Sequence, residues 1–151
     1  MKTLFYILFT FLIFVNSNAQ ESPKYDENLA KSLHSDEYGM KQYVFCILKT
    51  GSNTTATKEE RTKFFEGHMA NINKLANEGK LVLAGPFMKN DRNYRGLYIF
   101  NVETIEEALI LVESDPAVQA KIFEAELTPW YGSAAIQEVP KIHKTIQKTK
   151  I

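Results

Sequence analysis

The stretch Tyr-Val-Phe-Cys-Ile-Leu at residues 43–48 decides the fold of this chain. Six successive apolar residues are too few for a typical helix, and their aromatic and β-branched side chains favour a strand. Side chains alternate between the two faces of a sheet, so this unbroken run places apolar residues on both faces. Residues 43–48 are therefore predicted to form a central strand.

Two helices and three more strands are expected around this run. Thr57 and Glu60 form a capping box that begins a helix, which should end at Gly79. Thr104 and Glu107 form a second capping box, which begins the other helix. Apolar runs and alternation predict the remaining strands at residues 80–88, 96–102 and 121–130.

The resulting order, β-α-β-β-α-β, predicts an α+β fold of the ferredoxin-like type. This fold has a four-stranded antiparallel sheet with two helices on one face. Pro86 has no backbone N–H to donate, so its strand is expected at an edge, which leaves 43–48 and 96–102 in the centre. The two helices cover only one face. The apolar side chains of the other face predict a homodimer in which two sheets stack into a barrel.

The N-terminus has the features of a secretory signal peptide at residues 1–19. Lys2 precedes an apolar run at residues 4–15, and small residues before Gln20 indicate cleavage there. The run is about a dozen residues long, whereas a spanning helix needs roughly 20. An uncleaved N-terminal anchor is the alternative. Export to the periplasm or beyond the cell is expected, with no membrane span in the mature chain.

One domain is expected in the mature chain, at residues 40–139. A polar leader segment at 20–39 precedes it, and a basic tail at 140–151, with four lysines and no acid, follows it. The whole chain has 18 basic and 18 acidic residues, and nothing predicts the basic cluster on the folded face that a nucleic-acid surface would need. Cys46 is the single cysteine, which excludes an internal disulfide, and its apolar run predicts a buried, unreactive thiol.

His68 is the first candidate for chemistry. At about 100° per residue it lies on the same helix face as Phe64, Ile72 and Leu75, so it should point inward among apolar neighbours. One interpretation is a core histidine bonded to a backbone carbonyl. The other is an acid or base whose burial is offset by a nearby carboxylate.

Asp115 is the second candidate, although it also reads as the N-cap of a short helix that begins at Pro116. Pro86, Arg95 and Trp130 are weaker candidates for contacts to a substrate, because a strand-edge bend, a solvated loop arginine and a packed tryptophan are the commoner roles of such residues. The motifs typical of metal, nucleotide, dinucleotide and serine-hydrolase sites are absent from the sequence, so no metal or cofactor is expected.

These residues together resemble the YciI (YCII-related) family. His68 is followed by Gly-Lys-Leu-Val-Leu-Ala-Gly-Pro at 79–86, which is similar to the family's helix histidine and glycine–proline strand. Glu-Glu-Ala at 106–108, the Asp115–Pro116 pair and Thr-Pro-Trp at 128–130 match later family blocks in order and spacing. The resemblance covers about residues 41–131.

The resemblance implies a dimeric α+β barrel with an active site built from a paired histidine and aspartate, here His68 and Asp115. It also implies that a few relatives eliminate chloride from rings derived from chlorinated aromatics. This chain departs from the family at Phe65, where many members have arginine, and at Gly96-Leu97, where many have Gly-Ser.

Three functions are consistent with the sequence. The first is a cofactor-free lyase or isomerase that acts on an unknown small molecule. The second is a ligand-binding module of the cell envelope without turnover, and the third is a dimeric interaction module whose His–Asp pair is structural. An accessible His68 would favour the first two, and a sealed His68 would favour the third.

Overall fold

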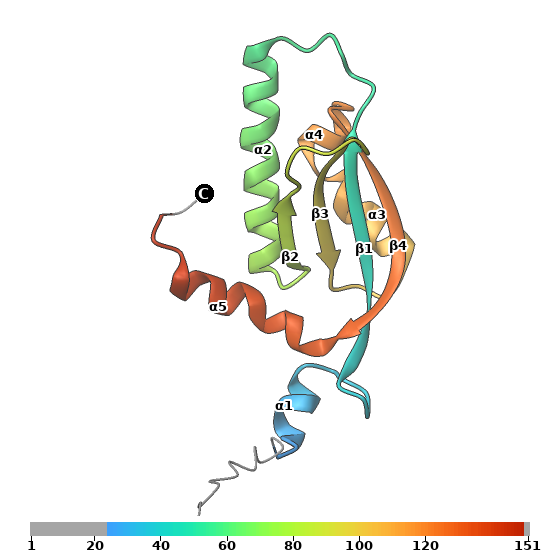
Figure 1. Cartoon of the computed structure of the whole chain (residues 1–151), viewed down its shortest axis with the longest axis vertical. Helices are drawn as coiled ribbons and strands as arrows, with labels where there is room; N and C mark the ends of the chain where they lie inside the picture. The colour runs from blue at the N-terminus through green and yellow to red at the C-terminus, as the bar shows by residue number, and fades with distance from the viewer. Residues whose placement is uncertain (1–23, 150–151) are drawn as a thin grey trace, which may run out of the picture.

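The computed structural model describes residues 24–149, so the expected signal peptide at 1–19 lies outside the described residues. Figure 1 shows the elements in chain order. They are α1 (Glu27–Ser32), β1 (Met40–Thr50), α2 (Lys58–Asn77), β2 (Leu81–Pro86), β3 (Tyr94–Phe100), α3 (Ile105–Glu113), α4 (Pro116–Gln119), β4 (Phe123–Ser133), the 3-10 helix η1 (Ala134–Glu138) and α5 (Val139–Ile146).

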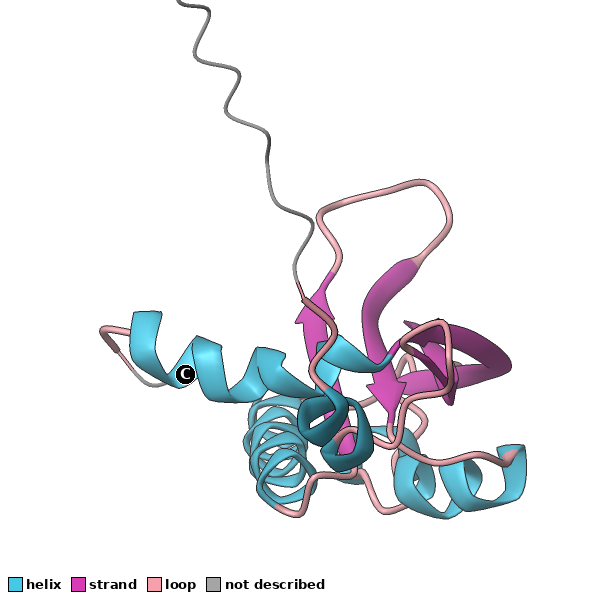
Figure 2. Cartoon of the chain, turned by 90° about the horizontal axis from the view of Figure 1, so that it is seen from below, coloured by secondary structure: helices cyan, strands magenta, loops and turns pink. Residues whose placement is uncertain are grey.

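The four strands form one antiparallel sheet in the order β2-β3-β1-β4. The strand at 43–48 is central, as predicted, and the strand that contains Pro86 lies at an edge. Helices α2 and α3 lie on the same side of the strands (Figure 2). The ferredoxin-like α+β fold is confirmed, and the sheet of one chain is open rather than closed into a barrel.

The strand boundaries differ from the predicted ones. β1 pairs with β4 from Met40 to Thr50, well beyond the apolar run at 43–48. β3 begins two residues earlier than expected, at Tyr94, and β4 continues to Ser133. Backbone hydrogen bonds do not require apolar side chains, so the ladder continues through polar residues that hydropathy does not reveal.

The local signals at the helix ends act as expected. The Thr57 hydroxyl accepts a hydrogen bond from the Glu60 N–H at 3.2 Å, and the Glu60 carboxylate accepts one from the Thr57 N–H at 2.8 Å. Gly79 follows α2 at φ +70°, a backbone conformation that glycine adopts with little strain. These caps fix the length of α2 and hence the position of His68 along it.

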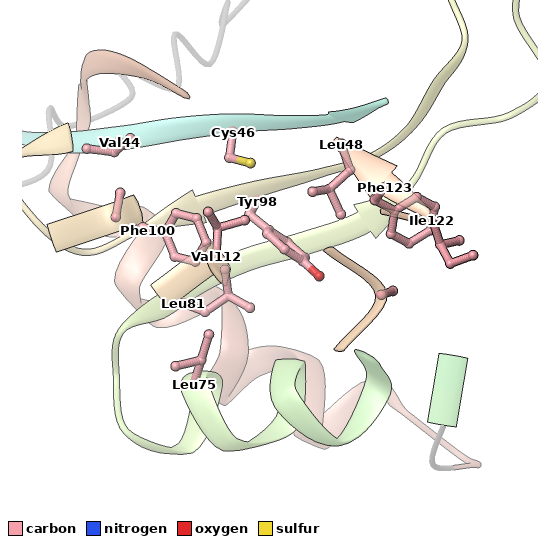
Figure 3. Packing of buried hydrophobic residues seen from close by; sticks show 12 residues of the cluster. Val44, Cys46, Leu48, Leu75, Leu81, Tyr98, Phe100, Val112, Ile122 and Phe123 are labelled. Atoms are coloured by element: carbon pink, nitrogen blue, oxygen red, sulfur yellow. The ribbon is translucent and has the colours of Figure 1, made fainter. Parts of the chain in front are cut away.

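The main core lies between the sheet and the helices. Alternate side chains of β1 and β3 point into it, and Figure 3 shows them packed against α2 and α3. Its largest fully buried apolar members are Phe100, Leu48, Leu81, Val44 and Val112. Cys46 is buried in the same core, as its apolar neighbours predict.

The face of the sheet without helices is not fully open in one chain. Tyr43, Val82 and Ile99 are buried there, and Ile136 of η1 packs against them. Within one chain, η1 therefore covers one end of the face that was expected to need a second subunit. Phe45 and Leu97, farther along the same face, remain partly exposed.

The segment expected as a basic tail begins with a helix. α5 lies beside β2 and crosses the C-terminal end of α2 (Figure 1). The Lys144 Nζ atom donates a hydrogen bond to Asn77 Oδ1 at 3.3 Å and so ties α5 to α2. Within residues 24–149, no helix has the length and apolar character to cross a membrane.

Candidate functional site

The site is built on a direct contact between His68 and Asp115. The middle of α2 carries His68, Asp115 is the N-cap of α4, and the Nδ1 and Oδ2 atoms lie 2.6 Å apart. Asp115 Oδ1 accepts a hydrogen bond from the Ala117 N–H at 2.9 Å. The two interpretations of Asp115 therefore hold together: one oxygen caps α4 and the other binds the histidine.

Gly67 allows this contact to form. A Cβ atom at Gly67 would lie 2.8 Å from Cγ of Pro116, closer than two carbon atoms approach without strain. Because Gly67 has no side chain, α4 packs directly on the backbone of α2. That close approach brings Asp115, the residue before Pro116, within hydrogen-bond distance of His68.

Tyr98 is a third member of the site. Its hydroxyl donates a hydrogen bond to Asp115 Oδ2 at 3.1 Å and lies 3.2 Å from His68 Nδ1. Figure 3 shows the ring pointing away from the sheet, toward the helices. Alternation along the strand places Tyr98 on the same face as Phe100, but no residue pattern marked it as a member of the site.

Asp115 is fully buried, and its charge influences its neighbours. Burial, with the negative charge of Asp115 as the second cause, raises the pKa of Tyr98 well above its ordinary value. The Tyr98 phenol therefore stays protonated and keeps its hydrogen-bond donor. The same two causes, burial first, raise the pKa of the Cys46 thiol to about 12, so this thiol is unreactive at neutral pH.

Aromatic rings surround the imidazole. The centroids of the Phe123, Tyr98 and Phe65 rings lie 5.2, 6.0 and 6.4 Å from that of His68. These rings exclude much of the water, and the His68 side chain remains 12% exposed. The expectation of a core histidine bonded to a backbone carbonyl is not met, because the observed partner of His68 is a carboxylate.

His68 lines a cavity of about 930 Å³ between α2, β2, the β2–β3 connection and α5. Of the other residues expected to contact a substrate, Pro86 and Arg95 also line it. Trp130 does not. It lies opposite Tyr43, on the face without helices, with the two ring centroids 5.8 Å apart. One chain therefore brings Pro86 and Arg95, but not Trp130, to the cavity of His68.

The chemical capacity of the site follows from its donors and acceptors. Within residues 24–149, no group of three or more histidine, cysteine or acidic side chains is arranged to hold a metal ion. A buried carboxylate hydrogen-bonded to Nδ1 holds that nitrogen as N–H, which leaves Nε2 to take or give a proton. The arrangement suits general acid–base chemistry on a small molecule.

The fold and the site define a small α+β protein with a His–carboxylate pair at a cavity. A model of the YCII-related domain matches residues 43–131, and the chain belongs to this family. No curated protein matches the sequence significantly.

Among solved structures, the chain is similar to the 5-chloro-2-hydroxyhydroquinone dehydrochlorinase of Burkholderia phenoliruptrix AC1100, in complex with 2,5-dihydroxybenzoquinone. The two are 21% identical, with a TM-score of 0.42. The match covers 58% of this chain and 92% of that one.

Proposed function

We propose that this protein is a cofactor-free lyase or isomerase in which His68 transfers a proton. One observation carries the proposal: a buried carboxylate lies 2.6 Å from the ring of a histidine that lines a cavity of about 930 Å³. A cavity of this size suits a small organic molecule. Proton transfer by a positioned histidine is a common source of rate enhancement in such sites.

The proposed mechanism assigns one role to each group. His68 Nε2 takes a proton from an acidic carbon of the substrate. The electron pair left behind forms a double bond to the next carbon, either as the bond from that carbon to a departing group breaks or as a neighbouring double bond shifts. The positive charge that develops on the ring is stabilised by Asp115 through Nδ1–H. The imidazolium then returns the proton to a departing group, as in a lyase, or to another carbon, as in an isomerase.

Asp115 has the support that this role requires. Its carboxylate accepts hydrogen bonds from the Ala117 N–H and the Tyr98 hydroxyl as well as from the ring of His68. These donors compensate a buried negative charge and fix its position. An aspartate held in this way keeps one tautomer of His68 throughout the reaction.

A ligand-binding module of the envelope without turnover is the second candidate. The size of the cavity and its many apolar lining residues favour it, because such a cavity binds small molecules whether or not a reaction follows. A purely structural role of the pair fits less well, since the His68 side chain is partly exposed and lines the cavity.

Isotope exchange tests the reaction directly. Small organic molecules that raise the melting temperature would be incubated with the protein in D2O, and their C–H signals followed by NMR. We expect loss of one C–H signal with the native chain and none with His68→Ala. His34→Gln alters an exposed histidine outside the cavity and should exchange at the native rate. Stable binding without any exchange would favour the binding module.

We also propose that the mature protein is exported. The charged residue, apolar run and small residues before Gln20 support this proposal. Mass spectrometry of the protein recovered from cells should find a chain that begins at Gln20 or within a residue or two of it. An intact Met1 on protein from the cytoplasm would contradict export.

We further propose a homodimer through the face of the sheet without helices. Phe45, Leu97 and Trp130 remain partly exposed on this face beyond the area that η1 covers. Apolar groups gathered on one face favour association with a second copy. Light scattering at micromolar concentration should give twice the mature mass, and a monomeric mass would refute the dimer.

A further inference from the structure

Basic residues, and no acidic ones, accompany the apolar residues that line the cavity. Three basic residues, Lys89, Arg95 and Lys144, line it together with His143, and its lining contains no aspartate or glutamate. The chain as a whole has equal numbers of basic and acidic residues, so this pattern is local. Asp115 lies behind His68, fully buried and hydrogen-bonded, and so does not offset these cations in the cavity.

The rest of the lining is largely apolar. Phe65, Ile72 and Leu83 contribute to the wall near α2 and β2, and Phe87 and Met88 contribute at the β2–β3 connection. These side chains suit a ring or chain of carbon atoms. An anionic group buried against them would lose its hydration, and a cationic side chain nearby would compensate part of that loss.

The cationic end at α5 comes from outside the family domain. The matched domain ends at residue 131, whereas α5 spans Val139–Ile146 and places His143 and Lys144 on the cavity. The Lys144 Nζ atom is held by Asn77 Oδ1 at 3.3 Å, and Asn77 lines the same cavity. A neutral amide oxygen leaves the charge of Lys144 without an anionic partner in this contact.

We propose that the cavity takes an organic anion with an apolar, ring-sized body, and that Lys144 of α5 binds its acidic group. The inference deepens the proposed function, since it names the class of substrate for the site of His68, but it requires only binding. α5 thereby determines specificity in a cavity whose other walls belong to the family domain. A cationic ligand would be repelled by the same side chains.

Two dyes test this inference without knowledge of the natural ligand. 1-Anilinonaphthalene-8-sulfonate has an apolar body and one negative charge, and N-phenyl-1-naphthylamine has the same body without the charge. Fluorescence titration of the full mature chain at low salt should give tighter binding of the sulfonate. Added salt should weaken that binding, since Lys144 is exposed to solvent.

Three variants place the binding in the cavity. Lys144→Gln should weaken the sulfonate dye about three- to fivefold, the loss expected for one solvent-accessible charge pair, and leave the neutral dye unchanged. Lys148→Gln removes the same charge from a residue that does not line the cavity and should change neither dye. Asn73→Trp fills the cavity from an exposed position on α2 and should weaken both dyes.

Each of three results would overturn the inference: equal affinity for the two dyes, equal effects of Lys144→Gln and Lys148→Gln, or undiminished binding by Asn73→Trp. Dye binding does not depend on proton transfer by His68. Failure of the isotope-exchange experiment would therefore leave the dye result standing, and failure of the dye experiment would leave the exchange result standing.

Discussion

Replacing Gly67 with alanine tests how the site is assembled, without removing any group that could take part in chemistry. An alanine in the interior of a helix is normally favourable by about 1 kcal/mol relative to glycine. Gly67 is different because α4 packs directly against its backbone. The added methyl carbon would lie 2.8 Å from Cγ and 3.1 Å from Cβ of Pro116.

The expected displacement follows from these distances. Two carbon atoms prefer a separation of about 3.5–4.0 Å, so α4 must move away from α2 by about 0.7 Å or more. Asp115 moves with Pro116, and the 2.6 Å contact with His68 would lengthen beyond about 3.2 Å, the limit of a good hydrogen bond. Overpacking costs about 1–3 kcal/mol and a weakened charged hydrogen bond about 1.5–3 kcal/mol. After the gain of about 1 kcal/mol in helix propensity, we expect Gly67→Ala to lose about 1.5–5 kcal/mol of stability.

Two measurements follow this change. Urea denaturation gives the free energy of unfolding, and proton NMR of the imidazole reports the Nδ1–H of His68, whose downfield resonance should shift upfield or exchange away. Gly85→Ala is the matched control, because a Cβ there meets nothing within 4 Å and its effect should stay within about 0.5 kcal/mol. A more stable Gly67→Ala protein with an unchanged His68 resonance would refute the role assigned to the close approach.

Three further predictions concern the buried groups of the site. Asp115→Asn should slow the proposed proton exchange by about 10²-fold or more, since the amide cannot stabilise the charged ring of His68. Exchange at the native rate would show that Asp115 does not assist His68. Tyr98→Phe should cost about 1–2 kcal/mol in urea denaturation, because Asp115 loses one donor, and no cost would mean that this hydrogen bond adds nothing. Stability should fall as the pH rises from 9.0, the usual pKa of a thiol, toward about 12, the raised pKa of Cys46, since in this window the Cys46 thiol ionises in the unfolded chain but not in the folded one. The fall is about 1.4 kcal/mol per pH unit. Cys46→Ala should flatten the fall below pH 10.0, the usual pKa of tyrosine, above which the raised pKa of Tyr98 adds to the fall. An equally steep fall below that pH in the variant would assign the effect to other groups.

Local sequence was sufficient for much of the fold. The run at 43–48 indicated a central strand, because only a strand with covered faces tolerates apolar residues at every position. The capping boxes at Thr57 and Thr104 placed the starts of the two helices, because a cap depends on neighbouring residues alone. Pro86 placed its strand at an edge, because a residue without an N–H interrupts a ladder.

Local sequence predicted only part of the candidate site. The helical period placed His68 inward, and the turn chemistry identified Asp115 as a cap. That the two should meet came from the resemblance to the YciI family and from the topology. The sequence contains no local signal for the third member, Tyr98, because a tyrosine on a core-facing strand position is usually explained by packing.

The sequence by itself determined the order and type of the main helices and strands and the face that their apolar residues present, because these properties depend on neighbours a few positions away. Only the tertiary structure decided that Pro116 packs against the backbone at Gly67 and that α5 places Lys144 on the cavity that His68 lines. It also decided that η1 covers one end of the sheet. Such contacts join residues far apart in the chain, and they depend on how closely the elements pack, which depends on side-chain volume throughout the core.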